Sequence, residues 1–267
     1  MHKGEPMHSS ELYQFDLNGY LVIEDAIDST ILDEIEPVVD QWQQRAEVPI
    51  NESQAKIEGI VANDERFLNI TMSPKVLARI TNLIQFPRLK STWLDFKSKG
   101  SSIGFHSNHT PYDPVDAYYW QNNIYANLVT VCYALCDIPI GGAALEVIPG
   151  SHKANYPLPE DTKLLSSLRK ELPLKKGSAL IFTHDMNHGS YNSLNYTRRC
   201  LFTSFSTGSS SNTQGENNLY YDLFKKQEEG SWRKYLLREP KGDRDTYPQP
   251  THSIEDETTL CEMATDR

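Results

Sequence analysis

Short apolar runs separated by turn-forming residues dominate the middle of this chain and limit the folds it can adopt. The runs cover residues 91–96, 127–136, 143–148, 178–183 and 198–206, with Gly, Pro, Asn and Asp between them. Each run is about as long as one β-strand. Closely spaced short strands are typical of sandwiches and jelly rolls. We therefore expect a mainly β fold with a jelly-roll core.

Two helical patterns precede these strands. Apolar residues recur at helical spacing over residues 31–42, where Ser29 or Thr30 can cap the helix. A second helix is predicted after Ser73, because Pro74 suits the first helical position. We expect these helices to flank the sheet.

The length of 267 residues fits one domain. Residues 219–237 have the pattern of a mobile amphipathic helix, and residues 238–267 are polar, contain proline and have few large aliphatic side chains. The sequence therefore predicts a single domain over residues 1–237, followed by a loosely ordered tail over residues 238–267.

The formal charge of −10, from 36 acidic and 26 basic residues, argues against binding to nucleic acid. No apolar run is long enough to cross a membrane, and the first residues do not resemble a signal peptide. The cysteines have no metal-finger spacing. We expect a cytoplasmic protein with a small-molecule partner, no nucleic-acid or membrane partner, and an oligomeric state that the sequence leaves open.

A possible metal site begins at His106. In a strand, His106 and Asn108 point to the same face, as the two ligands of a His-x-carboxylate pair do. His188 follows a second apolar strand, and Arg198 opens the next one. Two imidazoles and one carboxylate would leave positions open on iron for a 2-oxo acid and dioxygen. A buried Arg could bind the far carboxylate of that acid through two hydrogen bonds.

The order of several motifs resembles the phytanoyl-CoA dioxygenase family over roughly residues 10–206. The motifs are a Gly-Tyr pair near the start, the His-x strand, the element Pro149-Gly150-Ser151-His152-Lys153, the sequence His188-Gly189-Ser190, and the Arg that follows it. The Pro-Gly-Ser-His-Lys element is the most specific of these. The resemblance implies a double-stranded β-helix, which is a cupin-like jelly roll.

The resemblance also implies a set of ligands. Fe(II) would be held by His106 and His188, and the co-substrate 2-oxoglutarate by Arg198. Arg199 stays an alternative, because adjacent strand residues face opposite ways. Lys97 or Lys99 could also contact the co-substrate. The implied reaction uses O2, converts 2-oxoglutarate to succinate and oxidises a C–H bond of a small organic substrate.

Asn108 departs from the family pattern, which has a carboxylate at this position. No His-x-Asp or His-x-Glu sequence occurs elsewhere in the chain. An amide oxygen is neutral and a poorer ligand for Fe(II). Three hypotheses follow: an oxygenase completed by Asn108 or water, a halogenase that binds chloride at the vacated position, or an inactive ligand-binding scaffold. A loop carboxylate from Asp113, Asp116 or Asp185 could also take the place of the missing ligand.

Other polar and aromatic residues have two readings each. Tyr112, Tyr118 and Trp120 could form a substrate lid or belong to the core. His152 is interpreted as part of a packed turn rather than as a ligand. His184 could line the pocket or make a local hydrogen bond.

Overall fold

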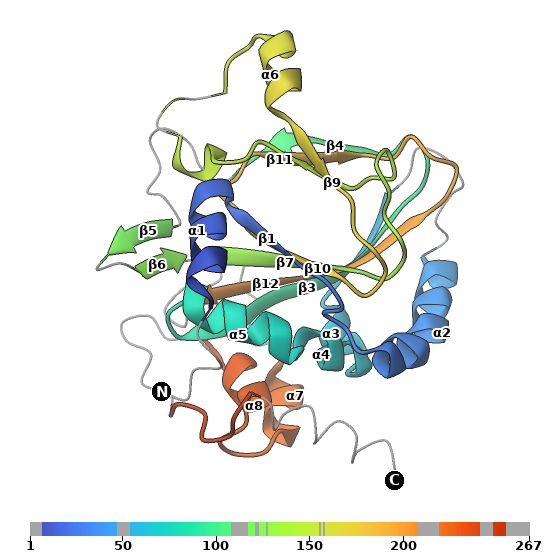
Figure 1. Cartoon of the computed structure of the whole chain (residues 1–267). Helices are drawn as coiled ribbons and strands as arrows, with labels where there is room; N and C mark the ends of the chain where they lie inside the picture. Colours follow the sequence, from blue (N-terminus) through green and yellow to red (C-terminus); the bar gives the residue numbers. More distant parts are fainter. Residues whose placement is uncertain are drawn as a thin grey trace.

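The computed structural model shows two antiparallel sheets that face each other (Figure 1). The larger sheet has the strand order β1-β10-β7-β12-β3-β2, the smaller sheet has the order β4-β11-β8-β9, and β5 pairs with β6 alone. The structure describes residues 7–46, 54–107, 117–120, 123–126, 128–154, 156, 158–207, 219–240 and 248–254, and only the backbone of 117–120 and 123–125.

The strands and helices have the following bounds. The larger sheet contains β1 (Tyr20–Ile23), β2 (Gln54–Glu58), β3 (Pro87–Lys97), β7 (Leu128–Ala134), β10 (Ala179–Thr183) and β12 (Arg198–Thr207). The other strands are β4 (Ser102–His106), β5 (Ala117–Trp120), β6 (Asn123–Ala126), β8 (Leu145–Val147), β9 (Lys170–Leu172) and β11 (His188–Tyr191). The helices are α1 (Ser9–Asn18), α2 (Ser29–Arg45), α3 (Ile60–Asn63), α4 (Arg66–Thr71), α5 (Pro74–Leu83), η1 (Ser151–Lys153), α6 (Thr162–Leu168), α7 (Tyr221–Lys226) and α8 (Trp232–Leu236).

The central strands of the larger sheet are buried on both faces. Helices α2, α4 and α5 lie on its outer side, away from the smaller sheet (Figure 1). Val131, Ile181 and Leu201 belong to the core cluster shared with these helices. The next residues along the same strands alternate to the other side, where Leu180 and Phe202 belong to a second cluster. The mainly β jelly-roll prediction with flanking helices is confirmed.

The C-terminal segment packs against the body of the protein. Residues 219–237 form two short helices, α7 and α8, instead of one mobile helix, and Tyr235 is fully buried. Arg238 donates hydrogen bonds to the carbonyl oxygens of Phe86 and Pro87 at 2.9 and 2.7 Å. Ile254 belongs to the main core. The mobile helix was therefore a wrong prediction, while the domain boundary at residue 237 stays a prediction.

Two motifs that are distant in sequence meet where the end of α1 contacts η1. Gly19 ends α1 with a φ of 81°, and a Cβ at this position would lie 2.6 Å from Nδ1 of His152. Nε2 of His152 donates a hydrogen bond to the carbonyl oxygen of Asp16 at 3.1 Å. Burial lowers the pKa of His152 to about 4, so the ring is neutral. His152 is thus a packing residue of the α1–β1 turn.

Candidate active site

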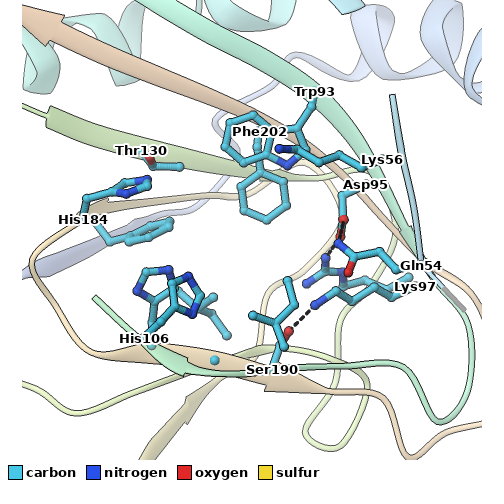
Figure 2. A pocket seen from close by; sticks show the side chains of 16 residues that line it. Gln54, Lys56, Trp93, Asp95, Lys97, His106, Thr130, His184, Ser190 and Phe202 are labelled. Atoms are coloured by element: carbon cyan, nitrogen blue, oxygen red, sulfur yellow. Dashed lines mark hydrogen bonds and ion pairs between the residues drawn. The ribbon is translucent and has the colours of Figure 1, made fainter. Parts of the chain in front are cut away.

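The space between the two sheets contains a cavity of about 260 Å³ (Figure 2). Its lining divides into an imidazole end, a charged end and an aromatic wall. The lining residues are Gln54, Lys56, Trp93, Asp95, Lys97, Ile103, His106, Thr130, Leu145, Phe182, His184, His188, Gly189, Ser190, Arg198 and Phe202.

Strand pairing brings His106 and His188 together at the imidazole end. β11 pairs antiparallel with β4, and His188 lies directly opposite His106. The ring centroids are 4.3 Å apart. Nδ1 of His106 lies 2.8 Å from the carbonyl oxygen of Gly104, and Nδ1 of His188 lies 2.7 Å from that of Met186. A carbonyl oxygen only accepts, so Nδ1 carries the proton on each ring and the Nε2 lone pair is available.

These two rings fit the requirements of an iron ligand pair. Burial lowers the pKa of His188 to about 4, so its imidazole is neutral and can coordinate at neutral pH. Nδ1–H bonds to backbone carbonyls are the usual way in which metal-binding histidines are oriented. Within the described ranges, no group of three or more His, Cys, Asp or Glu side chains is arranged to hold a metal.

Of the other candidate ligands, the structure describes His184 and Asp185. Asn108, Asp113 and Asp116 fall outside the described residues. Asp185 is buried but does not line the cavity. His184 does line it, with its ring centroid 6.0 Å from that of His188. The third ligand position is therefore still a prediction.

The two adjacent arginines face opposite sides of β12. Arg198 lines the cavity, is buried, and donates a hydrogen bond from Nη1 to the carbonyl oxygen of Ala143 at 2.8 Å. Its Nη2 forms an ion pair with Asp95. Arg199 instead pairs with Asp40, with 2.8 Å between Nη1 and Oδ1. Of the two, only Arg198 can reach a ligand in the cavity.

Lys97 lies beside Arg198 at the charged end. It is 1% exposed, and Nζ donates a hydrogen bond to Oγ of Ser190 at 2.5 Å (Figure 2). Burial lowers the pKa of Lys97 to about 8, so the side chain is still mostly protonated at neutral pH. Lys99 is exposed and does not line the cavity.

Sequence reasoning missed part of this charged end. Asp95 and Gln54 were not assigned a role, although both line the cavity, and Ser190 was quoted only as part of a motif. The period of two along a strand could have found Asp95, because it shares a face of β3 with Lys97. No local signal identified Gln54, since β2 joins the sheet only through its pairing with β3.

A pair of thiols lies behind the charged end. Burial opposes ionisation of Cys200, but a hydrogen bond with Cys132 and the positive charges of Arg198 and Lys97 together lower its pKa to about 7. Both cysteines are buried. The thiols therefore contribute to the electrostatics of the charged end without lining the cavity.

An aromatic wall lies across the cavity from His106 (Figure 2). Trp93 and Phe202 are stacked, with ring centroids 5.0 Å apart and an interplanar angle of 3°. Nζ of Lys56 lies 4.6 Å from the centroid of the Trp93 ring. This wall offers an apolar surface to a ligand near the imidazoles.

The predicted lid cannot be placed. Tyr112 lies outside the described residues, and the structure gives only the backbone of Tyr118 and Trp120, in β5. The lid therefore stays a prediction.

The described part of the chain contains no helix of the length and hydropathy needed to cross a membrane.

A jelly roll with two imidazoles and a buried Arg–Lys pair in its cavity has the layout of the 2-oxoglutarate-dependent oxygenases. The chain belongs to the phytanoyl-CoA dioxygenase family, whose model matches residues 15–200. The family is one of non-haem iron enzymes that use 2-oxoglutarate and O2. No curated protein matches the sequence.

Solved structures support the fold. HygX from Streptomyces hygroscopicus, with nickel and 2-oxoglutarate bound, has a TM-score of 0.66 at 20% identity, covering 76% of this chain and 88% of HygX. The epimerase SnoN from nogalamycin biosynthesis has a TM-score of 0.59 at 15% identity, covering 79% and 87%. The carbocyclase SnoK from the same biosynthesis has a TM-score of 0.60 at 12% identity, covering 83% and 92%.

Proposed function

We propose that this enzyme oxidises a C–H bond of a small organic molecule, with Fe(II) held by His106 and His188. Arg198 and Lys97 would hold the distal carboxylate of 2-oxoglutarate. The observation that carries this proposal is the division of one cavity into two ends. One end has two Nε2 atoms free to coordinate, and the other has two buried cationic side chains.

The overall reaction balances as 2-oxoglutarate, O2 and R–H giving succinate, CO2 and R–OH. When bound, iron would pass to dioxygen the electrons that come from 2-oxoglutarate and from the C–H bond. The protein orients the reactants. The carbonyl oxygens of Gly104 and Met186 hold the Nδ1 protons, so both Nε2 atoms stay available for the metal. Arg198 and Lys97 fix the far end of the 2-oxo acid, and the stacked Trp93 and Phe202 exclude water from one side.

Asn108 distinguishes this enzyme from relatives with a carboxylate ligand. We propose that Asn108 or water completes the iron site and that iron binds more weakly than with a carboxylate. Asn108→Asp should then raise the affinity for Fe(II) at least several-fold. Halogenation is the second candidate, because a vacated ligand position is where chloride would bind. An inactive ligand-binding scaffold is the third candidate function.

Anaerobic titration with Fe(II) and 2-oxoglutarate tests the proposal. A chelated 2-oxo acid on iron gives a visible charge-transfer band, and we expect this band for the wild type but not for His188→Ala. The absence of a band at millimolar iron, with the protein still folded, would overturn the oxygenase proposal in favour of the scaffold. A band that shifts on addition of chloride would instead favour halogenation.

The substrate class is part of the same proposal. Structures of HygX with hygromycin B and of SnoN with nogalamycin RO show that proteins of this fold hold small molecules. The aromatic wall opposite the imidazoles supports an organic substrate that presents an apolar face. Screening small organic molecules for substrate-dependent succinate release would identify it, and release without any hydroxylated product would count against hydroxylation.

A further inference from the structure

Asp95 places a buried negative charge at the co-substrate end of the cavity. Its side chain is 2% exposed and lies on β3, on the face that lines the cavity. One carboxylate oxygen pairs with Nη2 of Arg198, and the other accepts a hydrogen bond from Nε2 of Gln54 (Figure 2). Both oxygens are therefore engaged before any ligand enters.

Among the three buried charged side chains that line this end, the positive charges exceed the negative one. Arg198 and Lys97 supply two positive charges and Asp95 one negative charge, while the more exposed Lys56 pairs with Glu58. Nε of Arg198 is buried and has no hydrogen-bond partner among the described residues. The charged end thus keeps a free donor and the charge needed for one carboxylate.

We propose that Asp95 is a specificity-determining residue that restricts this end to a terminal group with a single negative charge. The inference rests on the proposed function, in which Arg198 and Lys97 bind the distal carboxylate of 2-oxoglutarate. A terminal group with two negative charges would place its second charge close to the buried carboxylate of Asp95, where water screens poorly. Asp95 therefore selects a carboxylate over a phosphate at the distal position.

Two 2-oxo acids of nearly equal length test the selectivity. In 3-phosphohydroxypyruvate a phosphate takes the place of the distal carboxylate of 2-oxoglutarate, and at pH 7 this phosphate is mostly doubly charged. The dissociation constants of both compounds are measured by calorimetry on the nickel-loaded protein. The quantity compared is their ratio on one preparation, because partial unfolding or partial metal loading cancels from it.

We expect the wild type to prefer 2-oxoglutarate. Asp95→Asn keeps the size of the side chain but removes its charge, and should shift the ratio toward the phosphate by about tenfold. Gln54→Lys is a second variant at a more exposed position, where the new cation would neutralise Asp95 and shift the ratio several-fold the same way. It keeps the test decisive if Asp95→Asn does not fold.

Asp40→Asn is the matched control, because it removes the carboxylate that pairs with the neighbouring Arg199 on the outer face. Its ratio should equal that of the wild type. An unchanged ratio in Asp95→Asn or Gln54→Lys, with 2-oxoglutarate still bound, would overturn the role of Asp95. Failure of the wild type to bind 2-oxoglutarate at all would instead overturn the proposed function.

Discussion

The two sheets contribute different ends of one cavity and are built differently. The larger sheet, covered by helices, supplies Arg198, Lys97 and Asp95, all of them buried. The smaller sheet supplies His106 and His188, and most residues of its strand β4 are exposed. A charged site needs a rigid and dry support, whereas a metal site needs access for dioxygen and substrate. The two requirements are met by two sheets.

The difference also shows how each side chain is held in place. Arg198 is held by an ion pair and a carbonyl oxygen inside a packed strand. His106 is exposed, and its Nδ1 donates a hydrogen bond to the carbonyl oxygen of Gly104. Packing orients the co-substrate end, and backbone hydrogen bonds orient the imidazoles.

The largest predicted effect is on the charged end of the cavity and leaves the imidazole end unchanged. Arg198→Ala should weaken binding of 2-oxoglutarate about 100- to 1,000-fold, because a buried charge-assisted interaction is lost. Metal affinity, which depends on the other sheet, should change little. Calorimetry with nickel and then with 2-oxoglutarate measures both quantities. Arg199→Ala is the matched control and should leave both nearly unchanged, so equal losses in the two variants would contradict the assignment.

Core substitutions should show that the larger sheet carries most of the stability. Leu201→Ala removes a fully buried side chain of β12 and should cost about 2–5 kcal/mol in the free energy of unfolding. Tyr191→Ala, in β11, removes a side chain that is 51% exposed and should cost less than about 1 kcal/mol. Urea unfolding measures both. Similar costs would mean that the sheets are equally packed.

The contact between the end of α1 and η1 can be tested at Gly19. Gly19→Ala adds a Cβ at a positive φ and 2.6 Å from Nδ1 of His152, so we expect a loss of about 1–3 kcal/mol in stability. The double variant Gly19→Ala, His152→Ala relieves the clash but not the backbone strain. It should therefore show less than the sum of the two single effects, and strict additivity would argue against the contact.

The smallest predicted effect is a pH dependence of the charged end of the cavity. Lys97 must be protonated to bind a carboxylate, so the affinity for 2-oxoglutarate should fall several-fold as the pH rises through about 8. The free protein should gain stability over that range, because the unfolded chain holds this proton up to a pKa of 10.5. The Lys97→Met variant should bind 2-oxoglutarate weakly, and its affinity should show no step near pH 8. A step that persists in this variant would belong to another group.

Local patterns in the sequence were enough for much of the fold and half of the site. The strand runs correspond to β3, β7, β8, β10 and β12, because alternation and turn residues are local signals. Pro74 begins α5 as predicted. The motif order also singled out His106 and His188, which the structure places opposite each other.

Other features depended on contacts between distant segments. α1 and β2 were not predicted, since β2 is defined by its pairing with β3. The packing of α8 and Ile254 against the core was also missed, because burial depends on the surface that a segment meets.

The adjacent arginines Arg198 and Arg199 show what the sequence determines and what only the tertiary structure decides. The sequence by itself determined that Arg198 and Arg199 face opposite ways, because side chains alternate along every strand. Only the tertiary structure decided that Arg198 faces the cavity, since the inner face of β12 is set by its neighbours β3 and β7 and by the helices behind them. The same folding brings Asp95 and Gln54 to Arg198, a grouping that no local pattern encodes.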